Sequence, residues 1–316
     1  MKTRLFSLSA LIATLLLTFM VGCNSNSAPA TKGDENRAEM ILKHLHNPAS
    51  DYIIVISHRG DWRNYPENSI PAIESVIEMG ADMVEIDIAM TKDSVLVLSH
   101  DRTLDRCTTG KGRIIDMTYD SLQTFDLESA HGGHFGYILK IPTLREALLV
   151  CKDRILVNID KGYDYYDEVL ALTEELGVTH QVLIKGGKPL AEVEAKLAEH
   201  ENNMLYMPII TPANEAHKPM FEEFIAAEKP QLAYEICWSK LTPEVESAME
   251  RVQKSGSKLW VNTLWNSLNG GLSDDVAWMT SADEVYGKLV DMGARMIQTD
   301  RPEFMIEYLR SRGMHD

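Results

Sequence analysis

The most informative chemical pattern in the sequence is a pair of carboxylates, Glu85 and Asp87, at the end of an apolar, β-rich run. Side chains two positions apart in a strand point to the same face, about 7 Å apart along it. Two carboxylates on a buried face are costly unless a positive group lies between them. One hard divalent cation, Mg²⁺ or Ca²⁺, would meet this need because it prefers oxygen ligands; a bridging arginine or lysine is the alternative.

Two histidines also follow β-rich runs. His58 precedes Arg59, and His100 precedes Asp101, a carboxylate that could orient its imidazole. Taken singly, each histidine is compatible with an ordinary core or surface role. Together with a cation that stabilises charge on phosphorus oxygens, they would suit phosphodiester cleavage. One imidazole would take a proton from the nucleophile, and the other would donate a proton to the leaving alkoxide.

Three further residues at the ends of runs could complete this site. Asp160 shares a strand face with Asn158 and could supply a third oxygen ligand to the cation. Lys161 and Lys185 end successive runs. Either ammonium group could neutralise a phosphate, or could simply face solvent.

These residues need a scaffold that brings the ends of strands together. Eight β-rich runs alternate with helical patterns, which predicts an α/β protein with a parallel sheet closed into a (β/α)8 TIM barrel. In such barrels the carboxyl ends of the strands carry the catalytic residues. An open doubly wound sheet is the alternative. The runs are 52–56, 83–89, 155–159, 181–184, 205–210, 232–236, 258–262 and 295–298, and the helical patterns are 69–79, 165–176, 189–199, 219–227, 243–255 and 282–292.

The interval between the second and third of these runs is too long for a single crossover. Residues 95–98 predict a short extra strand, and residues 102–140 predict a small, polar insertion over the mouth of the barrel. The delayed helix then begins after Thr143, a predicted N-cap, with Glu146 as its capping-box partner.

The start of the chain predicts export. Residues 1–22 combine a positive start with an apolar stretch, as in a signal peptide, and Gly22-Cys23 resembles a bacterial lipoprotein signal, in which the cysteine is lipidated. An ordinary signal peptide and an uncleaved anchor are the alternatives. Residues 23–37 predict a flexible tether, and residues 38–316 predict the barrel domain. The expectation is therefore a periplasmic or cell-surface lipoprotein that contacts the membrane only through its anchor at Cys23.

Charge and cysteine content exclude several classes of function. The formal net charge is −16 at pH 7, which argues against binding nucleic acid or an anionic membrane surface. Beyond Cys23 the chain has only Cys107, Cys151 and Cys237. Their scattered positions form neither a disulfide framework nor a zinc pattern.

From about residue 52 to 306 the chain resembles the glycerophosphodiester phosphodiesterase family. The resemblance implies a TIM barrel with a small insertion after the second strand, and hydrolysis of glycerophosphodiesters to an alcohol and glycerol 3-phosphate. The motifs that carry it are His58-Arg59-Gly60, Pro66-Glu67-Asn68-Ser69, Gly80-Ala81-Asp82, Glu85-Ile86-Asp87, Thr91-Lys92-Asp93, His100-Asp101, Thr108-Thr109-Gly110, Ile141-Pro142-Thr143-Leu144 and Gln298-Thr299-Asp300-Arg301-Pro302.

The resemblance also implies roles for individual residues. It makes His58 and His100 the acid/base pair, places Arg59 on the phosphate, and makes Glu85 and Asp87 metal ligands. Glu67 and Asp101 would support the site from its periphery. In many members the diester breaks through a cyclic phosphate made by a neighbouring hydroxyl of the substrate.

Two departures from the family pattern keep alternatives open. The family usually has Glu-x-Lys on the third strand, whereas this chain has Asp160 followed at once by Lys161, so that Lys161 and Lys185 compete for the phosphate. Trp260-Val261-Asn262-Thr263 changes the family's Trp-Thr order. Trp260, with Trp62, Tyr65 and Tyr163, could line the pocket or pack in the core. The alternative functions are a phospholipase-like or glycerophosphoinositol-type phosphodiesterase, and a catalytically weak binding lipoprotein on the same barrel.

Overall fold

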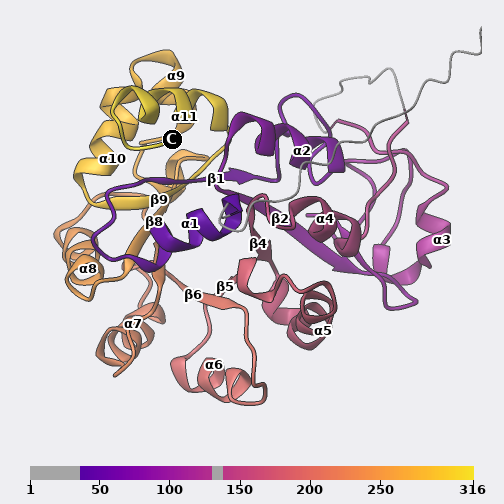
Figure 1. Cartoon of the computed structure of the whole chain (residues 1–316), viewed down its shortest axis with the longest axis horizontal. Coiled ribbons are helices and arrows are strands. Elements are labelled where there is room, and N and C mark those ends of the chain that lie inside the picture. The colour runs from indigo at the N-terminus through magenta and orange to yellow at the C-terminus, as the bar shows by residue number, and fades with distance from the viewer. Residues whose placement is uncertain (1–35, 130–137) are drawn as a thin grey trace, which may run out of the picture. The chain divides into compact units, whose positions relative to one another are not determined.

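A computed structural model describes residues 36–129 and 138–316, and a closed barrel of eight parallel strands lies at its centre (Figure 1). Each barrel strand pairs with its neighbours in parallel, and β1 pairs with both β2 and β9, which closes the sheet. The predicted TIM barrel is confirmed, and the open sheet is excluded. The barrel strands are β1 Ile54–His58, β2 Met83–Met90, β4 Leu156–Asp160, β5 Val182–Gly186, β6 Leu205–Ile210, β7 Ala233–Ile236, β8 Lys258–Asn262 and β9 Ala294–Thr299.

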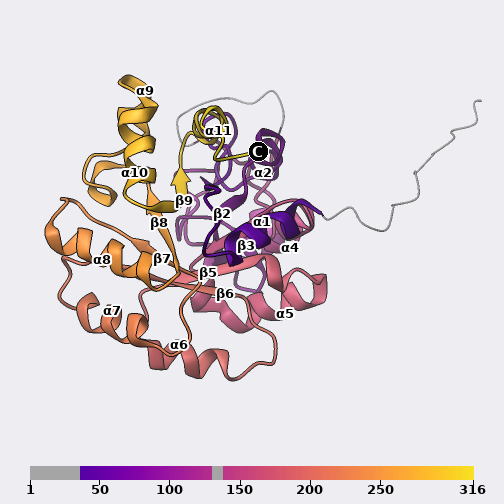
Figure 2. The ribbon, with the colours of Figure 1, turned by 60° about the vertical axis from the view of Figure 1, so that its left-hand side comes forward.

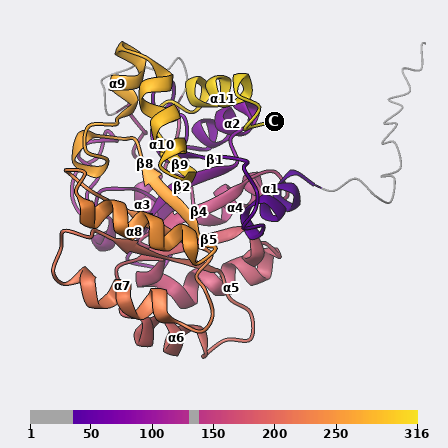
Figure 3. The same cartoon turned by 90° about the vertical axis from the view of Figure 1, so that its left-hand side faces the viewer.

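Helices cover the outer face of the barrel and bury the outward-facing side chains of the strands in one large apolar core. Figure 2 shows α6, α7 and α8 following one another along the barrel wall. Figure 3 places α11 beside α2, where the last and first β/α units meet. The outer helices are α2 Ile70–Met79, α4 Leu144–Cys151, α5 Tyr166–Leu176, α6 Leu190–Leu197, α7 His217–Ala226, α8 Pro243–Lys254, α9 Asp274–Met279, α10 Lys288–Asp291 and α11 Pro302–Ser311.

Helix α1 Arg37–His46 closes the amino-terminal end of the barrel. Its Asn36 N-cap accepts a hydrogen bond from the backbone N–H of Glu39, a capping interaction that stabilises the first turn. The buried side chains of Ile41 and Leu45 pack with inward-facing barrel residues such as Met83 and Leu156. The lower half of the barrel interior is therefore apolar core, and the polar residues predicted for the site lie above it, at the carboxyl end.

The insertion after β2 has a small apolar core of its own. Its first strand, β3 Leu96–Leu98, pairs antiparallel with β2, as the predicted extra strand requires. Two short helical segments follow, Ile114–Asp116 and α3 Tyr119–Leu122. The core of the insertion consists of Val97, Leu104, Ile114, Leu122 and Ile141.

Local signals correctly placed most elements, but not all of them. Thr143 and Glu146 form the predicted capping box at the start of α4. The sequence analysis did not identify α1, α9 or α11, and it assigned Arg37, the first residue of α1, to the tether. The predicted signal peptide, Cys23, most of the tether and residues 130–137 of the insertion lie outside the described residues. Among the described helices, none is both long and apolar enough to cross a membrane.

Candidate active site

The polar residues predicted from the sequence meet inside the barrel at its carboxyl end. The strand register determines how high each residue lies along the barrel axis. His58 pairs with Glu85, Glu85 with Asn158, and Asp87 with Asp160. Because alternate residues of a strand face the same way, these side chains lie above the apolar layer that α1 closes. In TIM barrels this end is the one that carries catalytic groups.

Glu85, Asp87 and Asp160 come together as a triad of carboxylates. Each offers one oxygen atom, and these three atoms lie within 4.8 Å of one another. An ion about 2.4 Å from each of two oxygens can join oxygens up to about twice that distance apart. Three hard oxygen donors at this spacing suit Mg²⁺ or Ca²⁺ better than a softer transition metal. The shorter side chain of Asp160 therefore still reaches the cluster.

The three carboxylates of the triad differ in how their charge is compensated. Burial, together with the charge of Asp87, raises the pKa of Glu85, and burial likewise raises the pKa of Asp160 against the opposing effect of Lys185. Burial also acts on Asp87, but the positive charges of Arg59 and Lys161 outweigh it and lower the pKa of Asp87. Within the described ranges, neither Glu85 nor Asp160 has a salt bridge. The neighbouring arginine and lysines thus compensate only part of the buried negative charge.

Arg59 contacts two carboxylates of this triad, Glu85 through its backbone and Asp87 through its side chain. Its φ of 55° lies in the left-handed region, which is unfavourable for a residue with a Cβ. This conformation lets its backbone N–H donate to Glu85 Oε2 at 3.0 Å. Its guanidinium donates to Glu67 Oε1 at 3.0 Å and lies 3.3 Å from Asp87 Oδ2. Arg59 therefore lies between the triad and the cavity at the mouth of the barrel.

His58 is oriented by a carboxylate from the far end of the chain. Its Nδ1 lies 2.7 Å from Asp300 Oδ1, and Trp62 Nε1 donates to the same oxygen at 2.6 Å. The imidazole packs edge-on against the ring of Trp265, with 6.0 Å between ring centroids. In the described part of the chain, His58 Nε2 has no hydrogen-bond partner. The bond to Asp300 favours the tautomer that carries its proton on Nδ1, leaving Nε2 to exchange a proton.

His100 is arranged in the same way by its neighbour in the sequence. Its Nδ1 lies 2.7 Å from Asp101 Oδ1, and its Nε2 has no hydrogen bond to any described residue. The hydrogen bonds from Arg106 and His100 lower the pKa of Asp101. Asp101 therefore stays ionised and can orient the ring. The two imidazoles come from different parts of the molecule, the barrel and the base of the insertion.

The two candidate phosphate-binding lysines occupy different environments. Lys161 Nζ donates to the backbone oxygen of His100 and lies 3.5 Å from Asp87 Oδ1, with a third of its side chain exposed. Lys185 is buried, and its Nζ lies 3.1 Å from Glu235 Oε2. Although burial opposes it, the charges of Glu235, Asp160 and Glu85 raise the pKa of Lys185. Lys161 is thus the lysine that remains accessible at the mouth of the barrel.

Trp260, for which the sequence left pocket lining and core packing open, lies in the core of the barrel. It is fully buried, its indole N–H donates to Asn262 Oδ1 at 2.9 Å, and Lys185 Nζ lies 5.2 Å from its ring centroid. Its strand position places it in the interior layer, where it supports Lys185 from below. The aromatic residues that line the mouth are Trp62 and Trp265. The open cavity there, of about 250 Å³, is lined by His58, Arg59, Trp62, Glu67, Arg106, Trp265 and Asp300.

Sequence reasoning missed several residues that organise the site. Asp300 lies in a recognised motif at the end of β9, so its position at the carboxyl end of a strand was an available signal. Asn68 accepts from the backbone N–H of Asp87 at 2.9 Å and donates to its carboxylate at 3.0 Å. Nothing in the local sequence indicated the role of Asp274, which accepts from the backbone N–H of Asp300 at 2.7 Å.

Comparison with known proteins finds related sequences along most of the chain. A glycerophosphodiester phosphodiesterase from Caldanaerobacter subterraneus subsp. tengcongensis is 29% identical over 271 residues, which cover 82% of this chain and 99% of that protein. A family model described as a domain of unknown function matches residues 206–309. The similarity to the bacterial enzyme thus extends over most of this chain and nearly all of that protein.

Solved structures share the architecture. The crystal structure of a glycerophosphoryl diester phosphodiesterase from Parabacteroides distasonis is 25% identical with a TM-score of 0.69, covering 88% of this chain and 92% of that one. An Oleispira antarctica phosphodiesterase, solved in complex with the product sn-glycerol-3-phosphate, has a TM-score of 0.61 at 22% identity, covering 82% of this chain and 97% of that one. The barrel is therefore a fold on which phosphodiesterases are built.

Asp274 generates a prediction about stability and pH. Burial raises its pKa to about 6, although hydrogen bonds from Asp300, Thr299, Tyr286 and Thr263 oppose the shift. The folded protein therefore keeps this proton up to about pH 6, whereas the unfolded chain releases it near pH 4. As pH rises from about 4 to about 6, the folded state loses stability, by about 3 kcal/mol in total.

Urea unfolding of the wild type and Asp274→Asn at pH 4, 5, 6 and 7 measures this effect. We expect the free energy of unfolding of the wild type, relative to the asparagine variant, to fall across this range. Asp275→Asn, at the exposed neighbouring position, is the control and should leave the pH slope unchanged. Parallel slopes for the wild type and Asp274→Asn would contradict the prediction.

Proposed function

This chain belongs to the glycerophosphodiester phosphodiesterase family, and from this premise we propose that it hydrolyses glycerophosphodiesters to an alcohol and glycerol 3-phosphate with one bound divalent cation and two histidines. It is a phosphoric diester hydrolase. The observation that carries the finer proposal is a largely buried carboxylate triad with an imidazole on each side of it. His58 pairs in register with Glu85, and His100 is joined through its backbone oxygen to Lys161, which lies 3.5 Å from Asp87. Each imidazole bonds a carboxylate through Nδ1. The related phosphodiesterase that binds sn-glycerol-3-phosphate as product supports the substrate class.

Glu85, Asp87 and Asp160 would hold the cation. When bound, Mg²⁺ or Ca²⁺ supplies positive charge that stabilises the negative phosphorus oxygens in the transition state. The fit rests on the donor chemistry, three carboxylate oxygens within 4.8 Å of one another, and on the absence of a salt bridge from Glu85 or Asp160 to any described residue. Arg59 and Lys161, on the accessible side of Asp87, would neutralise the remaining phosphate oxygens. Lys185 would balance the charge of the triad from below.

His58 and His100 would move the protons. One Nε2 removes the proton of the attacking group, a water molecule or a hydroxyl of the substrate, as its oxygen forms a bond to phosphorus. If the substrate hydroxyl attacks, a water molecule then opens the resulting cyclic phosphate to give glycerol 3-phosphate. The other Nε2 donates a proton to the leaving oxygen as its bond to phosphorus breaks. Each ring is held with Nε2 free because Asp300 or Asp101 bonds its Nδ1, and such fixed orientation favours proton transfer.

We expect a chelator to abolish activity. The purified soluble domain is assayed with glycerophosphocholine, glycerophosphoethanolamine and glycerophosphoinositol in EDTA, and again after addition of Mg²⁺ or Ca²⁺. Activity should return with the added cation, because without it the transition-state charge is not balanced. Asp87→Asn should prevent the recovery. The control is Asp167→Asn, which removes a carboxylate from the Asp167, Glu199 and His200 cluster, whose ligand atoms also lie within 4.8 Å of one another; this variant should recover like the wild type. Full activity of the wild type in EDTA would reject the metal role.

We also expect His58→Ala and His100→Ala to lower kcat by at least ~10²-fold each, the low end for general acid–base catalysis. The alanine side chain can neither accept nor donate the proton. Circular dichroism should show that both variants remain folded. His180→Ala, at an exposed position before β5, is the matched control with unchanged kcat. A kcat close to that of the wild type in either site variant would remove that histidine from the mechanism.

We further propose that the protein is an exported lipoprotein anchored through Cys23, on the basis of the signal-like pattern of residues 1–22. Expression of the full chain and of Cys23→Ser in a bacterial host tests this proposal. Detergent extraction of membranes and labelling with a radioactive fatty acid should recover the wild type as a lipidated membrane protein. The serine variant should incorporate no lipid. Equal labelling of both forms, or of neither, would reject the anchor.

A further inference from the structure

Arg106, a residue of the insertion, makes hydrogen bonds to two carboxylates that serve different parts of the site. Its Nε and Nη2 donate to the two oxygens of Asp101 at 2.8 and 3.1 Å. Its Nη1 and Nη2 donate to the two oxygens of Glu67 at 2.6 and 2.8 Å. One guanidinium therefore forms a double contact with each carboxylate, the geometry that makes arginine–carboxylate pairs directional as well as strong.

Each of these carboxylates is itself bonded to a residue of the proposed mechanism. Asp101 Oδ1 lies 2.7 Å from Nδ1 of His100, and Glu67 Oε1 accepts from Arg59 at 3.0 Å. Glu67 is only 8% exposed, and the hydrogen bonds from Arg106 and the charge of Arg59 lower its pKa despite burial. The result is a continuous chain of hydrogen bonds from His100, through Arg106, to Arg59 at the triad.

This chain matters because the two imidazoles have different surroundings. His58 ends β1 inside the barrel. His100 follows β3, whose Leu96 and Leu98 pack in the barrel core and whose Val97 packs in the core of the insertion, so His100 lies at the boundary between these two units. Glu67 lies in the loop after β1, on the barrel side. A contact between Arg106 and Glu67 therefore spans the boundary between the two units close to the reacting groups.

We propose that Arg106 is a positioning residue that holds the His100–Asp101 pair at the distance from the triad that proton transfer requires. This inference rests on the proposed role of His100. Arg106 acts through Asp101, which it keeps in place by two hydrogen bonds, and Glu67 fixes Arg106 against the barrel. It moves no proton itself.

The test is a double-mutant cycle in kcat and KM. We expect Arg106→Ala to lower kcat by ~10- to 100-fold, as is typical for loss of a group that orients a functional side chain, with KM changed by less than ~3-fold. In the His100→Ala background, Arg106→Ala should lower kcat by less than a further ~2-fold, because the histidine through which Arg106 acts is already absent. Arg106→Lys keeps the positive charge but cannot form two hydrogen bonds with each carboxylate. Its kcat should lie between those of the wild type and Arg106→Ala.

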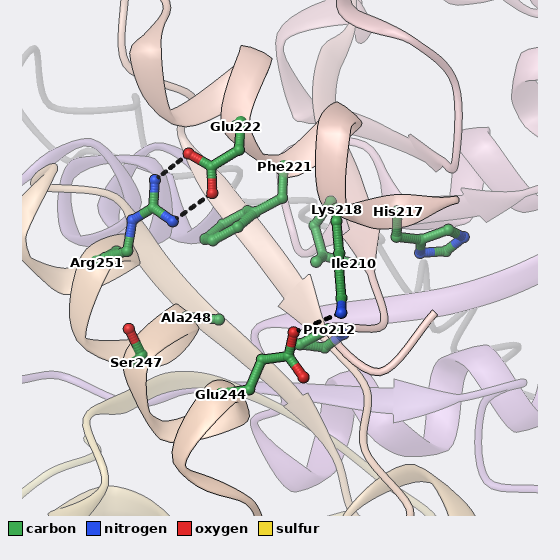
Figure 4. Close-up of a pocket in the computed structure, with 10 residues that line it drawn as sticks. All are labelled: Ile210, Pro212, His217, Lys218, Phe221, Glu222, Glu244, Ser247, Ala248 and Arg251. Carbon is green, nitrogen blue, oxygen red and sulfur yellow. Dashed lines mark hydrogen bonds and ion pairs between the residues drawn. The ribbon is translucent and has the colours of Figure 1, made fainter. Parts of the chain in front are cut away.

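The matched control is Arg251 on the outer wall of the barrel, shown in Figure 4. Its guanidinium donates to both oxygens of Glu222 at 2.6 and 2.7 Å, and its side chain is 37% exposed, as is that of Arg106. Arg251 belongs to α8 and Glu222 to α7, and the residues that line the pocket in Figure 4 include none of the proposed mechanism. Arg251→Ala should leave kcat and KM unchanged.

The outcomes separate this inference from the proposed function. If His100→Ala retains normal kcat, the proposed function fails. If His100→Ala loses activity while folded Arg106→Ala keeps a kcat within ~2-fold of the wild type, the positioning role alone is rejected. Losses that multiply in the double variant would also reject it, because they indicate an effect independent of His100. If Arg106→Ala does not fold, Arg106→Lys is used in the same cycle.

Discussion

The structure depends on one electrostatic constraint, the burial of three carboxylates at the carboxyl end of the barrel. Glu85, Asp87 and Asp160 lie within reach of one ion, and an uncompensated group of this kind would not remain charged in a folded interior. The surrounding residues compensate the charge in part. Arg59 and Lys161 act on Asp87 from the rim, and Lys185 acts from below while paired with Glu235. The remaining negative charge is the property on which the proposed cation binding rests.

The two ends of the barrel use polar groups for different purposes. At the amino-terminal end, Asp82 accepts hydrogen bonds from Tyr52 and from the backbone N–H of Val55, and it bonds Arg37 of α1 and His315 near the C-terminus. These bonds tie α1 and the C-terminal segment to the barrel. At the carboxyl end, the Nε2 atoms of His58 and His100 have no hydrogen bond to a described residue. Stability and reactivity are thus separated along the barrel axis, as is usual for this fold.

The insertion contributes to the site as well as to the periphery of the fold. A barrel strand supplies one imidazole and the base of the insertion supplies the other, so the distance between them is set by packing across a boundary. Arg106 and Glu67 cross that boundary with hydrogen bonds that have a fixed direction. Apolar packing alone would hold the two units together but would orient a ring less strictly, because dispersion contacts are not directional.

Residue pattern was sufficient to predict the barrel and the carboxylates, whereas orientation in space required the folded chain. Alternation along strands places Glu85 beside Asp87 and both above an apolar layer, and these are local properties of a strand. The pairing of His58 with Asp300 joins residues 242 positions apart, and no local rule specifies it. The same holds for the contacts of Arg106 with Glu67 and for the burial of Trp260 beneath Lys185. These features arise only when closure of the barrel brings distant strand ends together, because hydrogen bonds and burial depend on distance in space and not on separation along the chain.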